Sequence, residues 1–406
     1  MSDFYPARLG AVTRRQFLGI AGAGAFLLAG DEGLNVGKEM WAQERAWAEA
    51  EADNGSFLRD HARTFRNVAI GASFAPEQWR ASESGDEAAL PGLRWAVEEL
   101  GLRQIRLGLR WQRTESRRGV VDLGAYRPFL DYAFGKGLEL CLNLGPIRTF
   151  RWPEEHLPAW ASEVELPPSG ATVREGSPLA AAAADYHRRL LDALTSEYGR
   201  SALASVAIVQ VENEPFYRMR THHWRLDREY VANRVAEARA AFPASRVLVT
   251  SAARLDFGPV RDLFVDLMAR DAGLRDGRLL LGFDYHYKTP LRDSFPIIRY
   301  TDPITFARVG YQTCAEKRDE ARRLGYGIEV TEGQAEPNGY LTQPGNSARH
   351  FRFMLLRCAE SVLDASRPSV IRVWGIEEMA KKALAGRATA EHEAMFDLMR
   401  RLNGAA

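Results

Sequence analysis

The sequence predicts an α/β protein built as a (β/α)8 barrel, the TIM-barrel fold, with extended loops after its strands and a helical extension before the first strand. From residue 67 onward, eight short runs rich in Val, Ile and Leu alternate with segments whose apolar residues recur at helical spacing. The strand-like runs lack a regular polar alternation, as expected for parallel strands covered by helices on both sides. A doubly wound open sheet is the alternative, but no Gly-rich phosphate-binding turn follows an early strand.

The predicted elements alternate as strand and helix along the chain. The strands are expected at 67–73, 104–109, 138–144, 206–212, 246–251, 279–287, 326–332 and 369–374. The helices are expected at 86–100, 124–136, 177–198, 226–241, 259–270, 304–323, 346–364 and 389–402. The third helix has the strongest end signals, because Ser177 can cap it, Pro178 fits its first turn and Gly199 follows its end. Two long segments, near 146–176 and 288–303, are expected to shape a cleft, since loops carry specificity on a fixed scaffold.

The N-terminal part of the chain is expected to be separate from the barrel. We divide the sequence into an export signal at 1–30, a linker or accessory helix at 31–66 and the barrel at 67–406. The pair Arg14-Arg15 precedes an uncharged stretch that is too short to span a bilayer as a helix. This segment is similar to a twin-arginine signal, which implies export to the periplasm, the cell surface or the medium. Ala-x-Ala triplets occur within the apolar stretch itself, so an uncleaved signal that tethers the protein to a membrane stays an alternative.

Composition and charge exclude several classes of function. The 406 residues carry 54 Lys and Arg against 53 Asp and Glu, and 46% are hydrophobic, which is typical of a globular protein rather than a disordered or multi-span membrane protein. A net charge of +1 gives no field that would attract nucleic acid. Cys141, Cys314 and Cys358 are odd in number and widely spaced, so a disulfide framework is not expected. The sequence has no motif for a metal or another cofactor, and we expect neither.

Two glutamates at the ends of predicted strands indicate the chemistry. In a barrel, the C-terminal ends of the strands meet around one pocket. The fourth strand leads into Asn213-Glu214-Pro215 and the seventh ends at Glu332, so two carboxyl groups are expected at that pocket. Such a pair suits glycoside cleavage, in which one carboxyl group protonates the leaving oxygen and the other, ionised, attacks the anomeric carbon.

This arrangement resembles clan A of the glycoside hydrolases, especially families 5, 35 and 42, over about residues 67–376. In that clan, an Asn-Glu-Pro after strand four supplies the acid/base and a glutamate ending strand seven is the nucleophile. The resemblance implies that Glu214 is the acid/base, that Glu332 is the nucleophile and that Asn213 binds the 2-hydroxyl of the sugar. Glu336 is a rival nucleophile, but it lies beyond the expected strand end. The family itself stays open, because no accessory domain of families 35 or 42 is matched.

Further segments match the same clan. The run from Gly71 to Trp79 resembles the segment after strand one in family 42. Arg106 matches the strand-two arginine, which supports the nucleophile by charge and hydrogen bonding. The resemblance implies four more substrate-binding residues: Trp111 at the start of a W-x-x-x-E stretch, His286 and Tyr287 on strand six, and Trp374 at the end of strand eight. Tyr285 is the alternative to Tyr287 as the phenol that bonds the nucleophile.

The sequence therefore predicts a retaining β-glycoside hydrolase that cleaves O-glycosidic bonds of a β-linked oligo- or polysaccharide by double displacement. The expected partner is that carbohydrate, and nucleic acid is not expected. The alternative is an exported barrel that binds carbohydrate without cleaving it and would not need both carboxyl groups. A metal-dependent barrel hydrolase is disfavoured, because strand one has no histidine. The sugar, internal or terminal cleavage, and the oligomeric state stay open.

Overall fold

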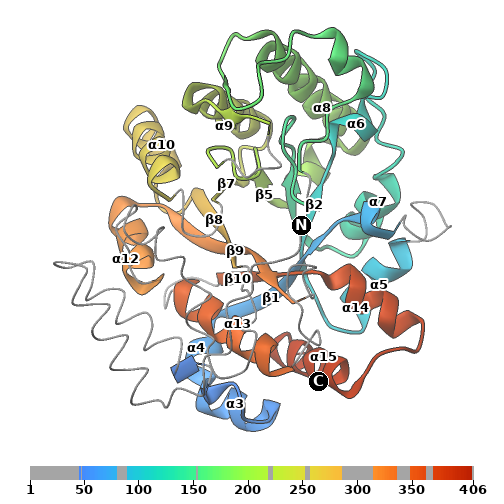
Figure 1. The fold of residues 1–406 in the computed structure, drawn as a ribbon, viewed down its shortest axis with the longest axis vertical. Coiled ribbons are helices and arrows are strands. Elements are labelled where there is room, and N and C mark those ends of the chain that lie inside the picture. Colours follow the sequence, from blue (N-terminus) through green and yellow to red (C-terminus); the bar gives the residue numbers. More distant parts are fainter. Residues whose placement is uncertain are drawn as a thin grey trace, which may run out of the picture.

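A closed barrel of eight parallel strands, surrounded by helices, forms the body of the molecule (Figure 1). The computed structural model describes residues 45–46, 48–79, 89–151, 154–217, 223–251, 257–285, 314–335, 348–362 and 369–404. The predicted (β/α)8 fold is confirmed. The predicted signal at 1–30 lies outside the described residues.

Each predicted strand is present in the barrel. Their bounds are β1 Val68–Phe74, β2 Gln104–Gly108, β3 Glu139–Asn143, β5 Val206–Gln210, β7 Arg246–Ser251, β8 Leu279–Tyr285, β9 Gly327–Gln334 and β10 Ser369–Trp374. Around the barrel they follow the order β1-β10-β9-β8-β7-β5-β3-β2, and the barrel closes because β1 pairs with both β2 and β10. Strand β9 runs two residues beyond its predicted end at Glu332, since Gly333 and Gln334 pair with β10.

The predicted helices are also present within the described residues. Their bounds are α5 Leu90–Glu98, α7 Arg127–Gly135, α8 Pro178–Leu203, α9 Arg228–Ala241, α10 Phe257–Arg270, α12 Cys314–Leu324, α13 Ala348–Val362 and α15 Ala390–Leu402. Ser177 caps α8 as predicted, because its side chain accepts from the Ala180 amide. Gly199 breaks the helix at a φ of 71°, but the helix resumes as far as Leu203.

Several short elements were not predicted. They are α6 Trp111–Thr114, α14 Ile376–Leu384, the 3-10 helices Pro76–Trp79, Ala159–Glu163 and Ala272–Leu274, and a two-stranded sheet of β4 Thr172–Val173 with β6 Arg225–Leu226. The small sheet joins the long loop after β3 to the loop after β5. The backbone pairing of β4 with β6 therefore connects the two loops that follow strands three and four of the barrel.

The barrel interior changes from apolar to polar along the strands. Cys141, Ile208, Leu248 and Leu280, from four neighbouring strands, form one buried cluster. Side chains alternate along a strand, so the residue two positions further on faces the same interior. Those positions are polar on three of the strands: Asn143, Gln210 and Thr250, each fully buried. On β3, β5 and β7 a polar layer thus lies above an apolar one, at the C-terminal ends of the strands.

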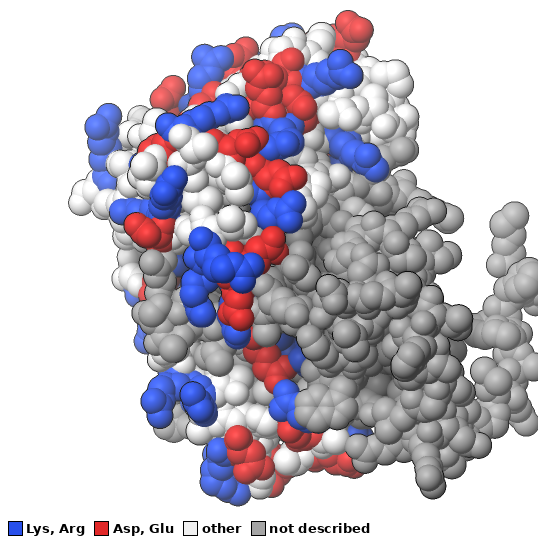
Figure 2. Space-filling model, turned by 90° about the vertical axis from the view of Figure 1, so that its left-hand side faces the viewer, with Lys and Arg blue, Asp and Glu red and all other residues white. Residues whose placement is uncertain are grey.

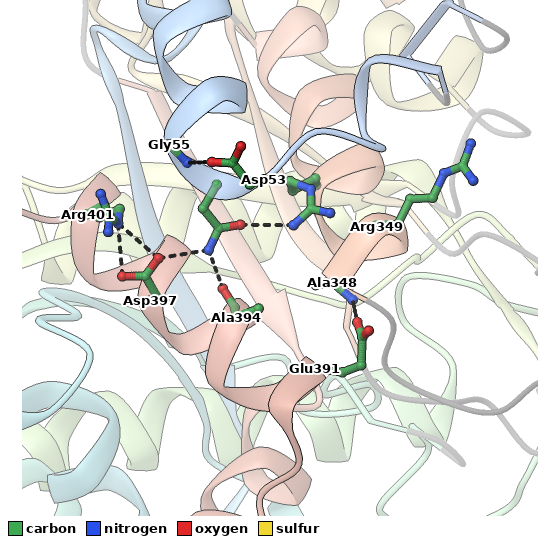
Figure 3. Close-up of a pocket in the computed structure, with 10 residues that line it drawn as sticks. Asp53, Gly55, Ala348, Arg349, Glu391, Ala394, Asp397 and Arg401 are labelled. Carbon is green, nitrogen blue, oxygen red and sulfur yellow. Dashed lines mark hydrogen bonds and ion pairs between the residues drawn. The ribbon is translucent and has the colours of Figure 1, made fainter.

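The described part of the 31–66 segment is helical and packs on the outside of the barrel. Helices α3 (Asn54–Asp60) and α4 (Ala62–Phe65) contact α15 and α13. The Asn54 amide nitrogen donates to the Ala394 carbonyl at 2.7 Å and to Asp397 at 2.9 Å, while its oxygen accepts from Arg352 at 2.9 Å. These contacts line a polar surface pocket between the N-terminal helices, α13 and α15 (Figure 3). These two short helices therefore lie against the outside of the barrel.

Figure 2 shows one face of the surface, where Lys and Arg side chains are interspersed with Asp and Glu over the described residues. This mixture agrees with the net charge of +1. None of the helices in the described ranges combines the length and the apolar character needed to cross a bilayer.

Candidate active site

Arg106 on β2 is the centre of the polar layer at the barrel mouth. Its side chain is fully buried, and its guanidinium group lies 4.2 Å from the centre of the Phe150 ring. The Nη1 atom donates to Glu332 at 2.7 Å and Nη2 donates to Asn213 at 2.6 Å. Nε donates to Gln210 at 2.7 Å. One planar cation therefore joins strand seven to the segment after strand four.

Glu332 lies on β9 and is 5% exposed. Its Oε1 accepts the bond from Arg106, and this ion pair is nearly enclosed by protein. A cation at hydrogen-bond distance favours the ionised carboxylate. Arg106 Nη1 also lies 3.2 Å from the Ser73 hydroxyl, which in turn donates to the Thr331 carbonyl at 2.7 Å. The position of Glu332 is thus fixed by strands one, two and seven together.

Asn213 and Glu214 follow β5, where the backbone turns sharply. The Asn213 oxygen accepts from Arg106, from Gln210 at 3.0 Å and from the Thr250 hydroxyl at 3.0 Å. Three donors on this oxygen set the orientation of the amide. Its Nδ2 group is buried and has no hydrogen-bond partner within the described ranges. This nitrogen can therefore donate to a ligand.

Glu214 is a non-glycine residue in the left-handed region, with a φ of 44°. Its side chain is 4% exposed, and its backbone nitrogen donates to the Thr250 hydroxyl at 2.8 Å. Asn213 and Glu332 bind the two amino groups of the Arg106 guanidinium, and Glu214 directly follows Asn213 in the chain. The structure thus brings the predicted residues Arg106, Asn213 and Glu332 together.

Glu212 is a buried carboxyl group that the sequence did not single out. It accepts from the backbone nitrogens of Ile147 at 3.3 Å and Arg148 at 2.7 Å, and from the Tyr230 hydroxyl at 2.9 Å. Complete burial raises the pKa of Glu212 to about 7, although these donors and the charge of Arg148 act in the opposite direction. Ser73, Gln210 and Thr250 also belong to the site and were missed. Polar residues at the ends of otherwise apolar strands were the signal.

Trp374 ends β10 and is partly exposed, as a sugar platform requires. The guanidinium group of Arg151 lies 4.0 Å from its ring centre. Arg151 has a φ of 79°, and its Nη2 donates to the fully buried Glu377 at 2.9 Å. The second oxygen of Glu377 accepts from the Ala75 amide after β1. One face of the indole therefore contacts a cation that is itself bound to the segments that follow the first and eighth strands of the barrel.

Trp111 does not lie where a substrate-binding residue is expected. It is fully buried, stacks on Tyr186 with 5.0 Å between ring centres, and meets Trp160 edge-on at 5.4 Å. Its indole nitrogen donates to Glu115 at 2.7 Å. Glu115 also accepts from the Gly119 amide, so the W-x-x-x-E stretch is a packed structural unit. We correct the expected role of Trp111 from substrate binding to packing.

Other predicted site residues lie outside the described ranges. These are His286, Tyr287 and the rival Glu336. Of Tyr285 the structure describes the backbone, which pairs with Gly333 of β9. Among the described residues, no group of three or more His, Cys, Asp or Glu side chains is arranged to hold a metal ion.

Neither a protein-family model nor a curated protein sequence matches this chain. Solved structures of xylanases are similar to it in fold. They include an intracellular xylanase from Thermoanaerobacterium saccharolyticum, which is 15% identical with a TM-score of 0.49 over 77% of this chain and 88% of that one. Xylanase 10B from Thermotoga maritima is 14% identical, with a TM-score of 0.48 over 86% of this chain and 99% of that one. Similarity at this level does not decide the reaction.

Proposed function

We propose that this chain is a retaining β-glycoside hydrolase that cleaves O-glycosidic bonds of a β-linked oligo- or polysaccharide. The observation that carries the proposal is the shared guanidinium of Arg106. It bonds Glu332 on strand seven and Asn213, the neighbour of Glu214, after strand four. These are the positions at which the clan A resemblance places nucleophile and acid/base.

The reaction follows from the two carboxyl groups. Glu332, ionised, attacks the anomeric carbon and forms an ester bond while the glycosidic carbon–oxygen bond breaks. Glu214 gives its proton to the leaving oxygen. In the second step Glu214 takes a proton from water, the water oxygen bonds to the anomeric carbon, and the ester to Glu332 breaks. Both carboxyl groups return to their starting protonation states.

The surrounding residues support each of these steps. Arg106 stabilises the negative charge of Glu332 before attack and again when the carboxylate is released. Asn213 Nδ2 is available to donate to the hydroxyl next to the anomeric carbon. Trp374 offers a flat aromatic surface, which suits the C–H-rich face of a sugar ring. The substrate is thus bound by the same residues that place it against Glu332.

The test uses the roles of the two glutamates. Glu332→Ala is expected to abolish hydrolysis of every β-glycoside, and azide should then yield the α-glycosyl azide because it replaces the missing nucleophile. Glu214→Ala should keep activity on aryl glycosides whose leaving group needs no proton. Full hydrolysis of an activated β-glycoside by Glu332→Ala would refute the assignment. Binding of β-glycans without hydrolysis by the wild-type protein would indicate a carbohydrate-binding barrel instead.

We also propose that the protein is exported through the twin-arginine-type segment at 1–30. The support is the pair Arg14-Arg15 ahead of a short uncharged stretch. Fractionation of cells that express the full chain and an Arg14→Lys, Arg15→Lys double variant tests this. Export of the native chain and retention of the variant are expected, and a cytoplasmic native chain would refute it. Recovery in the membrane fraction would identify an uncleaved tether.

A further inference from the structure

We propose that Arg148 and Glu212 form a reciprocal clamp that positions Glu214 as the proton donor. The inference rests on the proposed function and extends it to two residues outside the pair of Glu214 and Glu332. Arg148 lies in the loop after β3 and Glu212 in the segment after β5. Each residue holds the backbone of the loop that carries the other.

Glu212 holds the loop after strand three. Its two carboxyl oxygens accept from the successive backbone nitrogens of Ile147 and Arg148. Tyr230, from α9, donates its hydroxyl to the same carboxyl group at 2.9 Å. Glu212 is fully buried, so water cannot replace these donors. The carboxyl group therefore fixes the backbone on either side of the bond that joins Ile147 to Arg148.

Arg148 holds the loop after strand four in return. Its Nη1 donates to the Glu214 carbonyl at 2.6 Å and to the Tyr217 carbonyl at 2.8 Å. Its Nη2 donates to the Trp224 carbonyl and lies 3.5 Å from Glu155. The Arg148 carbonyl also accepts from the backbone nitrogen of Asn213 at 3.2 Å. One fully buried side chain thus binds backbone carbonyl groups along the segment that begins at the predicted acid/base.

The clamp acts on the residue whose backbone most needs support. Glu214 has a φ of 44°, and a non-glycine residue in this region persists where its surroundings hold it. Both polar groups of its backbone are held: the nitrogen by Thr250 and the carbonyl by Arg148. Glu332, in contrast, is held by Arg106 from strand two of the barrel. Loss of the clamp should therefore displace the proton donor and leave the nucleophile in place.

The kinetic consequence distinguishes positioning from general support. A displaced acid lowers the rate for substrates whose leaving group must be protonated. A leaving group that departs as a stable anion needs no proton, so the rate for such a substrate should change little. A displacement of about 1 Å can cost about 100-fold in rate. We therefore expect Arg148→Met to lower kcat/KM about 100-fold for a phenyl β-glycoside and less than about 5-fold for the 2,4-dinitrophenyl β-glycoside. Arg148→Lys should recover part of the loss, because an ammonium group can bond one of the carbonyls.

Arg372→Met is the matched control. Arg372 is also a fully buried arginine of the barrel interior, but it pairs with Glu329, and within the described ranges it makes no hydrogen bond or ion pair with the loop of Glu214. Its loss is expected to lower stability and to affect both substrates equally. Should Arg148→Met fail to fold, Glu212→Gln carries the same comparison, because it replaces one of the two oxygens that accept from the loop of Arg148 with an NH2 group, which cannot accept. Kinetics of each variant are measured on the folded fraction, as judged by circular dichroism.

Two outcomes separate the failures. A wild-type protein that hydrolyses no β-glycoside would overturn the proposed function, and the clamp would have no reaction to serve. The clamp alone would be overturned if the wild-type protein is active but Arg148→Met and Glu212→Gln lower kcat/KM equally for both leaving groups. The same holds if their effects match those of Arg372→Met. A selective loss on the phenyl glycoside in the Arg148 and Glu212 variants supports it.

Discussion

Gly145 offers a direct perturbation of the contact between the loops after strands three and four. A Cβ atom added at this residue would lie 2.3 Å from the carbonyl oxygens of both Arg148 and Val211, and 2.8 Å from the Cα of Glu212. These are backbone atoms, which cannot rotate away as a flexible side chain can. Cβ atoms essentially never approach closer than 3.0 Å, so Gly145→Ala must move the backbone of Arg148, in the same loop, and of Val211, in the other loop, away by about 0.7 Å.

The expected cost of Gly145→Ala has two parts. Overpacking of a close contact costs about 1–3 kcal/mol. The separation also stretches the bond from the backbone nitrogen of Arg148 to Glu212, now 2.7 Å long, and a hydrogen bond contributes about 0.5–1.5 kcal/mol. We therefore expect the free energy of unfolding to fall by about 1.5–4.5 kcal/mol. A domain with about 5–15 kcal/mol of stability still folds after such a loss.

The assay compares Gly145→Ala with Gly135→Ala by guanidinium denaturation and by hydrolysis of a phenyl β-glycoside. Gly135 ends helix α7, and a Cβ there would have nothing within 4 Å. Its replacement is expected to leave activity unchanged and to stabilise the helix by up to about 1 kcal/mol. Gly145→Ala should also lose activity on the phenyl glycoside. Stability within about 0.5 kcal/mol of wild type and unchanged activity would refute the close contact and its role.

Three further predictions concern charge in the site. Glu332→Gln leaves the buried Arg106 without its carboxylate partner. We therefore expect kcat/KM to fall at least about 10⁴-fold and the free energy of unfolding to fall by about 3 kcal/mol. Wild-type kinetics would contradict this. The pKa of Glu212, raised to about 7 by burial, means that the folded state holds this proton more tightly than the unfolded chain. Its stabilising contribution is therefore present below about pH 4.5 and is lost as the pH rises to about 7. The free energy of unfolding of the wild type, measured against that of Glu212→Gln, should fall by about 3 kcal/mol over that pH range. A difference that stays constant with pH would contradict this. Arg151→Met removes the cation beside Trp374 and should raise KM about 5-fold with little change in kcat, and an unchanged KM would show that the stacked pair does not shape the sugar site.

The barrel could be predicted because each strand is a short apolar run that ends at a helix signal. Strand ends were harder to predict. The run that includes Glu212 looked like strand to its end, but β5 stops at Gln210 and the next residues turn so that the Glu212 carboxyl can bind the neighbouring loop. Helix α14 was missed although Ile376, Met379 and Ala380 lie on one buried face. The sequence analysis expects only one helix after strand eight, at 389–402, whereas two are present.

Site residues could be predicted where a local motif in or next to one strand identifies them. Arg106, Asn213 and Glu332 were identified from motifs, and the structure places them in contact. The clamp of Arg148 and Glu212 joins loops that are more than sixty residues apart, and no local pattern encodes such a contact. Trp111 shows the opposite error, because an indole four residues before a glutamate resembled a substrate site although the two bond each other.

The stereochemistry of hydrolysis tests the central claim most directly. Proton NMR of a fresh reaction with an aryl β-glycoside reports the anomeric configuration of the sugar before it mutarotates. Attack by Glu332 followed by water inverts the anomeric carbon twice, so the β-anomer should appear first. Initial release of the α-anomer would mean that water attacks directly, and it would contradict a covalent intermediate on Glu332.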